Sequence, residues 1–280
     1  MRVNPLLLLA GAFLLTGCGG TAAPAASSVS SPAPPSSVMP PSSAPPSSST
    51  APVSSPVSPP PSTSAAGKVV VLDPGHNGGN GAHPKEINRS VPAGRGEMKP
   101  CNTTGTSTNA GYTEHAFNFD VARQVGEALS AKGIKVVYTR SDDSGVGPCV
   151  DRRAEIGNEA KADAVVSIHA DGSTAEGAHG FHVAYSSPPL NKAQGAPSMA
   201  LARALRDGLR SDGFTTSTYI GSAGLSARSD LGGLNLSTRP TVLVECGNMR
   251  NTAEAAAMSS AAGRAHYATA IAAAIEAYLG

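Results

Sequence analysis

Three short runs of aliphatic residues limit what this chain can fold into. They are VVVL at 69–72, AVVSI at 164–168 and TVLV at 241–244, and none of them alternates apolar with polar residues. An aliphatic run without alternation suits a strand that is covered on both faces, which is the normal state of a parallel sheet. We therefore expect an α/β fold, a single domain in which helices cover both faces of a mostly parallel twisted sheet.

Segments with helical spacing separate these runs. The segment EHAFNFDVARQVGEALSAKG carries an apolar stripe and ends at Gly133, so we expect a helix there. The stripe consists of Phe117, Val121, Val125 and Leu129. We also expect strands at IKVVYTR and HGFHVAYSS, helices at VDRRAEIGNEAKA and SMALARALRDGLRSDG, and a helical Ala-rich terminus. A long polar loop reaching about Tyr112 and a Gly/Ser-rich stretch at 215–240 complete the expected pattern.

The first 17 residues have the composition of an export signal. Their apolar stretch LLLLAGAFLL is shorter than the ~20 residues that a membrane-spanning helix needs. The ending LTGC resembles the lipobox of bacterial lipoproteins, in which cleavage precedes the cysteine and the thiol is acylated, so we expect a lipid on Cys18. An ordinary cleaved signal that leaves Cys18 free is the alternative.

Residues 18–67 are almost entirely Ser, Pro, Ala, Thr and Val after the cysteine. Such a segment holds too little apolar volume to offset the entropy of ordering, so we expect a tether. Residues 68–280 have regular apolar patterning and suffice for one well-buried domain. The predicted location follows: the chain is exported and lipid-anchored to the outer face of the cytoplasmic membrane, within the cell envelope.

Charge and cysteine usage narrow the function classes. The chain has 21 Lys and Arg against 20 Asp and Glu, without a basic cluster, so nucleic acid is not an expected partner.

In an exported chain, disulfides form where geometry permits. Cys101 and Cys149 lie in loop-like stretches whereas Cys246 ends a buried run, so we pair the first two and leave Cys246 as a buried thiol. A chain without this bridge is the alternative.

A polar side chain follows each of the three aliphatic runs. His76 comes after the first run, His169 after the second and Glu245 after the third. Since ligands bind where parallel strands end, we expect a pocket there. Glu114, at the start of the helix after the long loop, is a fourth candidate, although a helix's first turn favours acidic residues in any case. Two histidines and a carboxylate are a recurrent ligand set for catalytic zinc, and a second glutamate can then handle protons.

Five motifs in this order are similar to those of a known enzyme family. LDPGHNG, TEHAFNFDVA, TRSDD, VVSIHAD and VLVECGNMRN resemble the zinc-dependent N-acetylmuramoyl-L-alanine amidases, which cleave peptidoglycan between N-acetylmuramic acid and L-alanine. The similarity spans 68–280 and is greatest to mycobacterial and actinobacterial stand-alone catalytic domains. It implies one zinc ion held by His76, Glu114 and His169, and catalysis by Glu245.

The resemblance also implies partners and a role. It implies peptidoglycan or muropeptide fragments as substrate and a part in cell-wall remodelling and cell separation. We expect a monomer, although the sequence leaves the oligomeric state open. The chain departs from the family in two places. It has Glu114-His115 where an acidic-basic pair is common, which leaves His115 as a rival ligand, and it has Cys246-Gly247-Asn248 where a phenylalanine follows the glycine.

Other polar residues have less specific signals. Arg228, Asp230 and Asn235 lie in the Gly/Ser-rich stretch and are candidates for gripping the stem peptide. His179, near a strand start, could contact substrate, although a structural histidine is the favoured interpretation. Asp73 could orient the imidazole of His76 or cap the turn that follows it.

Two alternative functions use the same residues. A zinc peptidase or carboxypeptidase acting on the stem peptide needs the same ligands and base. A wall-binding module without catalysis is the other, but such a module typically lacks Glu245 or a ligand, and this chain has all four residues.

Overall fold

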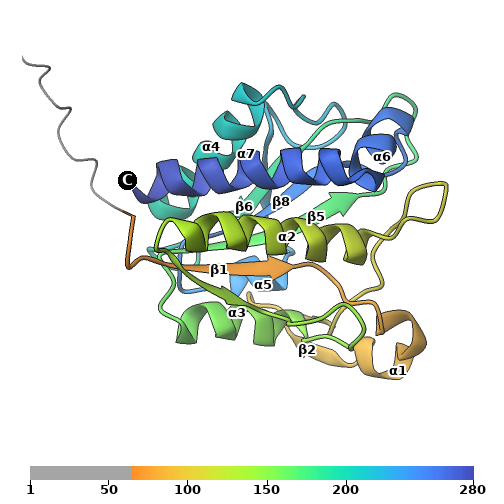
Figure 1. Ribbon diagram of the computed structural model, residues 1–280. Helices are drawn as coiled ribbons and strands as arrows, with labels where there is room; N and C mark the ends of the chain where they lie inside the picture. Colours follow the sequence, from red (N-terminus) through yellow and green to blue (C-terminus); the bar gives the residue numbers. More distant parts are fainter. Residues whose placement is uncertain (1–64) are drawn as a thin grey trace, which may run out of the picture. The chain divides into compact units, whose positions relative to one another are not determined.

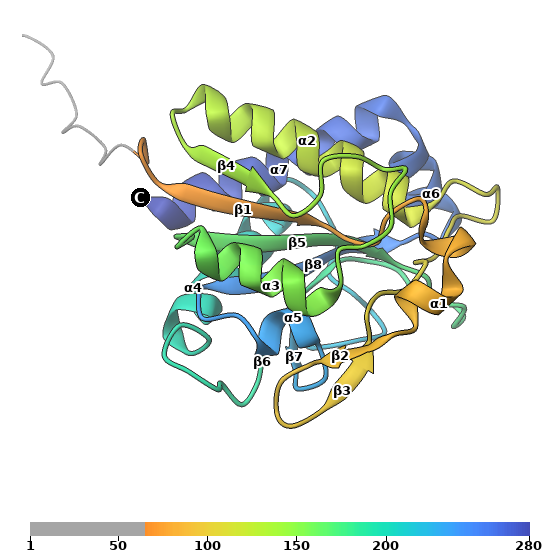
Figure 2. The same cartoon turned by 90° about the horizontal axis from the view of Figure 1, so that it is seen from below.

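A computed structural model describes residues 65–280. The predicted signal at 1–17, Cys18 and nearly all of the predicted tether lie outside these residues. The described part of the chain is a three-layer sandwich, with a six-stranded sheet between two layers of helices (Figures 1 and 2). The predicted α/β fold with a mostly parallel sheet is confirmed.

The sheet has the strand order β4-β1-β5-β8-β6-β7. Its parallel part consists of β4 (Lys135–Tyr138), β1 (Val69–Pro74), β5 (Ala164–Asp171) and β8 (Thr241–Asn248). The strand β6 (His182–Ser186) is antiparallel to β8, and β7 (Leu225–Arg228) is parallel to β6. The three aliphatic runs are thus the adjacent central strands β1, β5 and β8, whose carboxyl ends meet at one edge.

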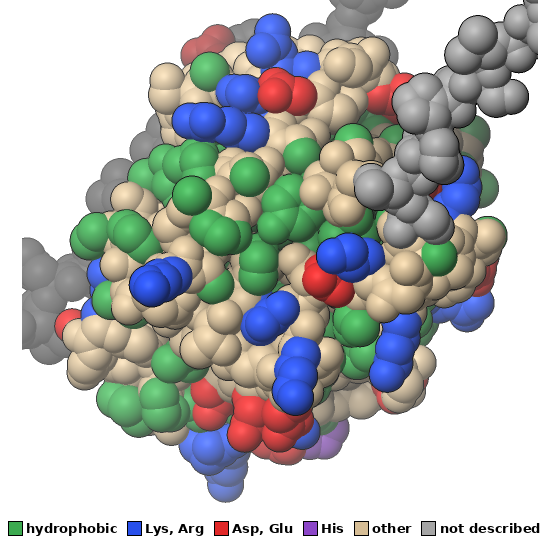
Figure 3. Space-filling model, turned by 90° about the vertical axis from the view of Figure 1, so that its left-hand side faces the viewer, with side chains coloured by type: hydrophobic (Ala, Val, Ile, Leu, Met, Phe, Trp, Pro, Cys, Tyr) green, Lys and Arg blue, Asp and Glu red, His purple; other side chains and the backbone are tan. Residues whose placement is uncertain are grey.

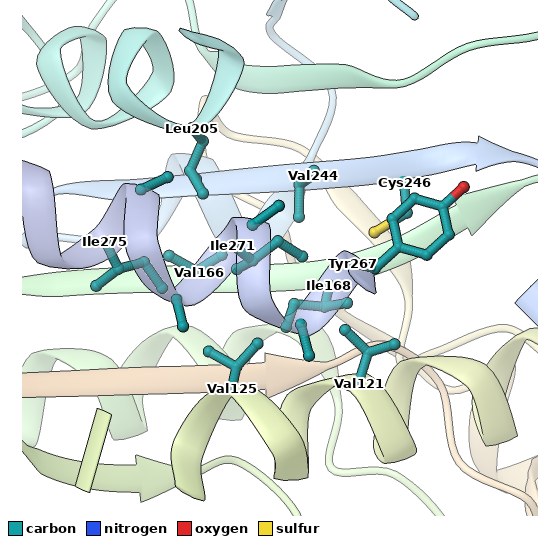
Figure 4. Close-up of a cluster of buried hydrophobic side chains, with 14 of the residues drawn as sticks. Val121, Val125, Val166, Ile168, Leu205, Val244, Cys246, Tyr267, Ile271 and Ile275 are labelled. Atoms are coloured by element: carbon teal, nitrogen blue, oxygen red, sulfur yellow. The ribbon is translucent and has the colours of Figure 1, made fainter. Parts of the chain in front are cut away.

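Helices cover both faces of the sheet, and the thicker layer holds the main core. This layer consists of α2 (Glu114–Ala131), α4 (Ala196–Ser211) and α7 (Ala261–Leu279), which α6 (Thr252–Ser259) precedes. Figure 4 shows Val121 and Val125 of α2 packing towards Ile271 of α7 and towards Val166 and Ile168 of β5. Each of these side chains is fully buried and contributes roughly 1.5–3 kcal/mol to stability.

The opposite face carries α3 (Val150–Glu159) and α5 (Gly232–Asn235) (Figure 2). These two helices are short and leave part of the sheet uncovered, so this face can hold a pocket. The buried residues of α3 include Arg153 beside Ala154 and Gly157.

The long polar loop that we expected contains regular structure, so that expectation is wrong in detail, and the Gly/Ser-rich stretch contains regular structure as well. The first holds a 3-10 turn (Asn80–Ala82), α1 (Pro84–Ile87) and a hairpin of β2 (Ser90–Pro92) and β3 (Met98–Pro100). The second, at 215–240, holds β7 and α5. Elements of three or four residues are too short to produce a periodic pattern, and distant contacts stabilise them instead.

One such contact is the disulfide between Cys101 and Cys149, whose Cα atoms lie 4.3 Å apart. It joins the segment after the hairpin to the start of α3, and it is the pairing that we predicted from the sequence. Cys246 is a buried free thiol that packs beside Tyr267 in the main core (Figure 4).

The end of the molecule where the strands begin carries mixed side chains. Figure 3 looks onto this end, where acidic and basic groups are scattered among apolar ones. Within residues 65–280, the helices are too short or too polar to cross a membrane. The carboxyl ends of the four parallel strands β4, β1, β5 and β8 lie at the other end (Figure 1).

Candidate active site

Three side chains from three elements converge beyond the carboxyl ends of the central strands. His76 follows β1, Glu114 is the first residue of α2, and His169 lies near the end of β5. One nitrogen or oxygen atom of each lies within 4.8 Å of the corresponding atoms of the other two. Residues that are 93 positions apart in the sequence, a separation given by 169 − 76, therefore form one compact cluster.

Glu114 sits between the two histidines. Its Oε1 atom lies 3.0 Å from Nε2 of His76 and 3.0 Å from Nδ1 of His169, and its Oε2 accepts a hydrogen bond of 2.8 Å from the backbone N–H of Thr106. Burial opposes ionisation of this carboxyl, but the histidines outweigh it through charge and hydrogen bonds and hold the pKa of Glu114 well below its usual range. Glu114 is therefore a carboxylate at neutral pH.

The hydrogen bonds of His76 define which of its nitrogens can bind a cation. Nδ1 lies 3.0 Å from the carbonyl oxygen of Thr103, which can only accept, so Nδ1 carries the proton. Nε2 then faces Oε1 of Glu114, another acceptor, at 3.0 Å. A proton on Nε2 or a metal cation between the two atoms satisfies both. Two imidazoles and one carboxylate are donors that zinc prefers, so the cluster fits a zinc ion.

His115, the rival ligand, points elsewhere. Its Nδ1 lies 2.7 Å from Oδ2 of Asp143, and Oδ1 of Asp143 accepts from Nη1 of Arg140 at 2.8 Å. Adjacent helical residues project about 100° apart, so only one of the two first-turn residues can face the histidines. In this structure that residue is Glu114.

Glu245 lies beside the cluster on the neighbouring strand. It is the register partner of His169 in the parallel pair of β5 and β8, so the two side chains leave the same face of the sheet. Its Oε2 is completely buried and has no hydrogen-bond partner among residues 65–280. Burial, reinforced by the negative charges of Glu114 and Asp171, raises the pKa of Glu245 well above its usual range. Its carboxylate is therefore a stronger base than an exposed glutamate.

These four side chains line one end of a cleft of about 470 Å³. The cleft continues along the inner face of β5 and β8 past Leu243 to Thr241, between Ala154 of α3 and Leu231 and Leu234 next to and within α5. The end that holds these four side chains is polar, and the remainder is lined by both aliphatic and polar side chains. A bound molecule can thus place a polar group beside Glu245 while an apolar part lies along the sheet.

The four predicted substrate contacts do not line this cleft. Arg228 and Asp230 form an ion pair with each other, at 2.7 and 2.8 Å, and Asn235 is buried and accepts a hydrogen bond from Arg95 of the hairpin. His179 donates from Nδ1 to the carbonyl of Gly177 at 2.7 Å. Their roles in substrate binding stay predictions, and the observed contacts are structural.

Asp73 has neither of the two roles considered for it. It belongs to β1, so its side chain points across the sheet face rather than along the turn. Oδ1 accepts from Thr139 and Arg153 at 2.6 and 2.7 Å, and Oδ2 accepts from Ser167 at 2.6 Å. Burial opposes ionisation, but the Arg153 guanidinium and these hydrogen bonds lower the pKa of Asp73 to about 2. Asp73 is thus the buried counter-ion of Arg153.

Sequence reasoning missed Arg153 and Arg140, which both contact the turn that carries His76. A signal was present for the first of them. Arg153 falls on the buried stripe of its helix, where an arginine needs a specific partner.

The fold and the site together define a class. A mostly parallel α/β sheet that presents a His-Glu-His cluster and a partly buried glutamate at its carboxyl edge is typical of metal-dependent hydrolases. Comparisons with known proteins specify the family. The model of the N-acetylmuramoyl-L-alanine amidase family matches residues 70–277, so this chain belongs to that family.

Three relatives agree with this assignment. The chain is 50% identical over 206 residues to the N-acetylmuramoyl-L-alanine amidase Rv3717 of Mycobacterium tuberculosis, a match that covers 74% of this chain and 84% of the relative. The crystal structure of the amidase Ami1 from Mycobacterium smegmatis matches with a TM-score of 0.75 and 50% identity, over 78% of this chain and 99% of the other. Ami1 from Mycobacterium abscessus matches with a TM-score of 0.74 and 52% identity, over 77% and 100%.

Proposed function

We propose that this protein hydrolyses the amide bond between N-acetylmuramic acid and L-alanine in peptidoglycan, using one zinc ion. The observation that carries the proposal is the register of β5 and β8, which sets the partly buried Glu245 beside the cluster of His76, Glu114 and His169. Membership of the amidase family supports this choice of bond.

The cluster would hold the metal through Nε2 of His76, Nδ1 of His169 and a carboxylate oxygen of Glu114. A zinc ion bound there would supply Lewis acidity, which polarises an amide carbonyl and makes a water molecule more acidic. The chain keeps the ligands in the required protonation states. The carbonyl of Thr103 retains the proton of His76 on Nδ1, and the low pKa keeps Glu114 ionised.

Glu245 would perform the proton transfers. As the water oxygen bonds to the muramoyl carbonyl carbon, the Glu245 carboxylate takes the proton that this oxygen loses. It then gives the proton to the alanine nitrogen as the carbon–nitrogen bond breaks. The products are a muramoyl carboxylate and a peptide with a free amino terminus. The raised pKa of Glu245 suits both steps, because the carboxylate accepts the proton readily and holds it until the amine leaves.

Product analysis tests the proposal. The purified protein is incubated with muramyl dipeptide and with peptidoglycan, and the products are identified by mass spectrometry. We expect the released peptides to begin at L-alanine and to be of full length. Glu245→Gln should release none, whereas the control Glu127→Gln, in an exposed helical ion pair, should match the wild type. Shortened stem peptides would instead indicate a peptidase.

The proposal extends to the whole chain. Residues 1–17 would direct export, Cys18 would carry a lipid, and 18–67 would tether a monomeric catalytic domain to the membrane. The described chain enters β1 at its amino end, at the end of the sheet opposite the His-Glu-His cluster. Such an enzyme would act in cell-wall remodelling and cell separation.

Cell fractionation tests the anchor. We expect Cys18→Ser to move the protein from the membrane fraction to the soluble fraction. A wild-type protein that is already soluble would contradict the anchor without affecting the assignment of the catalytic residues.

A further inference from the structure

The backbone of His76 has a conformation that the fold must impose. Its φ angle is +61°, in the left-handed region that a non-glycine residue rarely adopts. The preceding Gly75 is packed against the His169 ring so closely that an added Cβ would lie 2.2 Å from it. The turn therefore brings the two histidines together only in this backbone conformation, and other residues have to stabilise that conformation.

Two buried arginines bind the carbonyl oxygens of this turn. Arg153 donates from Nη1 to the carbonyl of Pro74 and from Nη2 to that of His76, each at 2.7 Å. Arg140 donates from Nε to the carbonyl of Pro74 at 2.9 Å and from Nη2 to that of Gly75 at 3.3 Å. Of the two, only Arg153 contacts the carbonyl of His76 itself.

Arg153 is fixed in turn by its own surroundings. Its side chain is 4% exposed, its Nη1 pairs with Asp73 at 2.7 Å, and its Nε donates to the carbonyl of Pro148 at 2.8 Å. The guanidinium thus joins both sides of the turn to the segment that leads into α3. A lysine has one nitrogen and cannot bind four such acceptors in a plane.

The same end of α3 also holds the imidazole of His76. Cys149, which caps α3, is bonded to Cys101, and the backbone N–H of Val150 donates to the carbonyl of Cys101 at 2.8 Å. Two residues further on, the carbonyl of Thr103 accepts from Nδ1 of His76 at 3.0 Å. The start of α3 therefore holds both parts of His76: the backbone through Arg153, and the ring through the segment that the disulfide joins to α3.

We propose that Arg153 is the positioning residue for the metal ligand His76: it holds the ligand's strained backbone in place and so sets the affinity of the site for zinc. This inference rests on the proposed function, because it concerns the same metal site. Arg153 contacts no reacting atom in this account and acts only through His76.

The test compares zinc affinity with folding. Arg153→Lys and Arg153→Gln are prepared in the full chain, with Arg152→Lys as the matched control on the neighbouring, half-exposed arginine, whose partners are Glu155 and Glu159. The zinc dissociation constant is measured by competition with a chromophoric chelator, and circular dichroism reports the fold. We expect both Arg153 variants to bind zinc at least about tenfold more weakly, as is usual when a residue that orients a ligand is lost. The control should keep the wild-type constant.

Two further readouts separate positioning from a general effect on stability. With zinc raised above its new dissociation constant, turnover of the Arg153 variants should return towards the wild-type rate. A folded variant with unchanged zinc affinity overturns the inference, even if its melting temperature falls. If neither variant folds, Asp73→Asn serves instead, since it keeps the guanidinium but removes the carboxylate that orients it. A folded Asp73→Asn protein with wild-type zinc affinity would likewise overturn the inference, whereas a wild-type protein without zinc binding would overturn the proposed function.

Discussion

Replacing Asp73 with asparagine should lower the free energy of unfolding by about 2 kcal/mol at neutral pH. Asparagine keeps the size of the side chain but cannot carry the charge that faces Arg153. The fold lowers the pKa of Asp73 from 3.8 to about 2, a difference of about 1.8, and each unit corresponds to about 1.36 kcal/mol. The product is about 2.4 kcal/mol. This value already contains the attraction between Asp73 and the buried Arg153, because that attraction is one of the causes of the lowered pKa.

The pH dependence separates this charge effect from a packing effect. A carboxyl with a lowered pKa stabilises the fold fully above its unfolded-state pKa, and this stabilisation is lost as the pH falls from about 4 towards about 2. Urea unfolding of metal-free wild type and Asp73→Asn should therefore give a difference that is constant from pH 7 to 5. Near pH 3 it should be smaller by roughly half of the charge contribution. A difference that stays constant down to pH 3 would refute the electrostatic argument.

Three other perturbations have defined outcomes. Glu245→Gln should retain zinc and lose turnover. It should also raise the melting temperature of the metal-free protein at neutral pH, because the raised pKa of Glu245 means that the fold disfavours the ionised carboxyl. That gain should shrink as the pH approaches the unfolded-state pKa of 4.5, and an unchanged melting temperature at pH 7 would contradict it. Replacing Cys101 and Cys149 together by serine should cost about 4 kcal/mol in urea unfolding, from the 48-residue separation that the bridge spans, and equal stability with and without reductant would count against this. Zinc at about a hundred times its dissociation constant should stabilise the protein by about 2.7 kcal/mol in thermal unfolding and chelator should reverse this, whereas no shift would argue against binding to the folded state.

The sequence predicts the central sheet and the cluster of His76, Glu114 and His169 because both depend on local patterns. An uninterrupted aliphatic run indicates a doubly covered strand, and the residue that follows it lies at the carboxyl edge. The adjacency of β1, β5 and β8 then brings His76, His169 and Glu245 together. The position of Glu114 follows from the start of its helix.

What the sequence does not predict depends on contacts between distant residues. Asp73 and Arg153 are 80 positions apart, and the pattern of neither segment indicates the other. The hairpin of β2 and β3 is held against Asn235, 140 positions after Arg95, so its short strands have no signal of their own. Asn235 was predicted to grip substrate because it lies in a polar stretch, but composition does not distinguish a polar residue that faces a cleft from one that holds a hairpin.

Zinc binding and amide cleavage are tested together by measuring the zinc content and the reaction products of residues 65–280. We expect one zinc ion per chain and release of L-alanyl-D-isoglutamine from muramyl dipeptide, abolished by chelation and restored by zinc. A protein that binds no zinc, or that releases this dipeptide equally well with chelator present, would contradict this expectation.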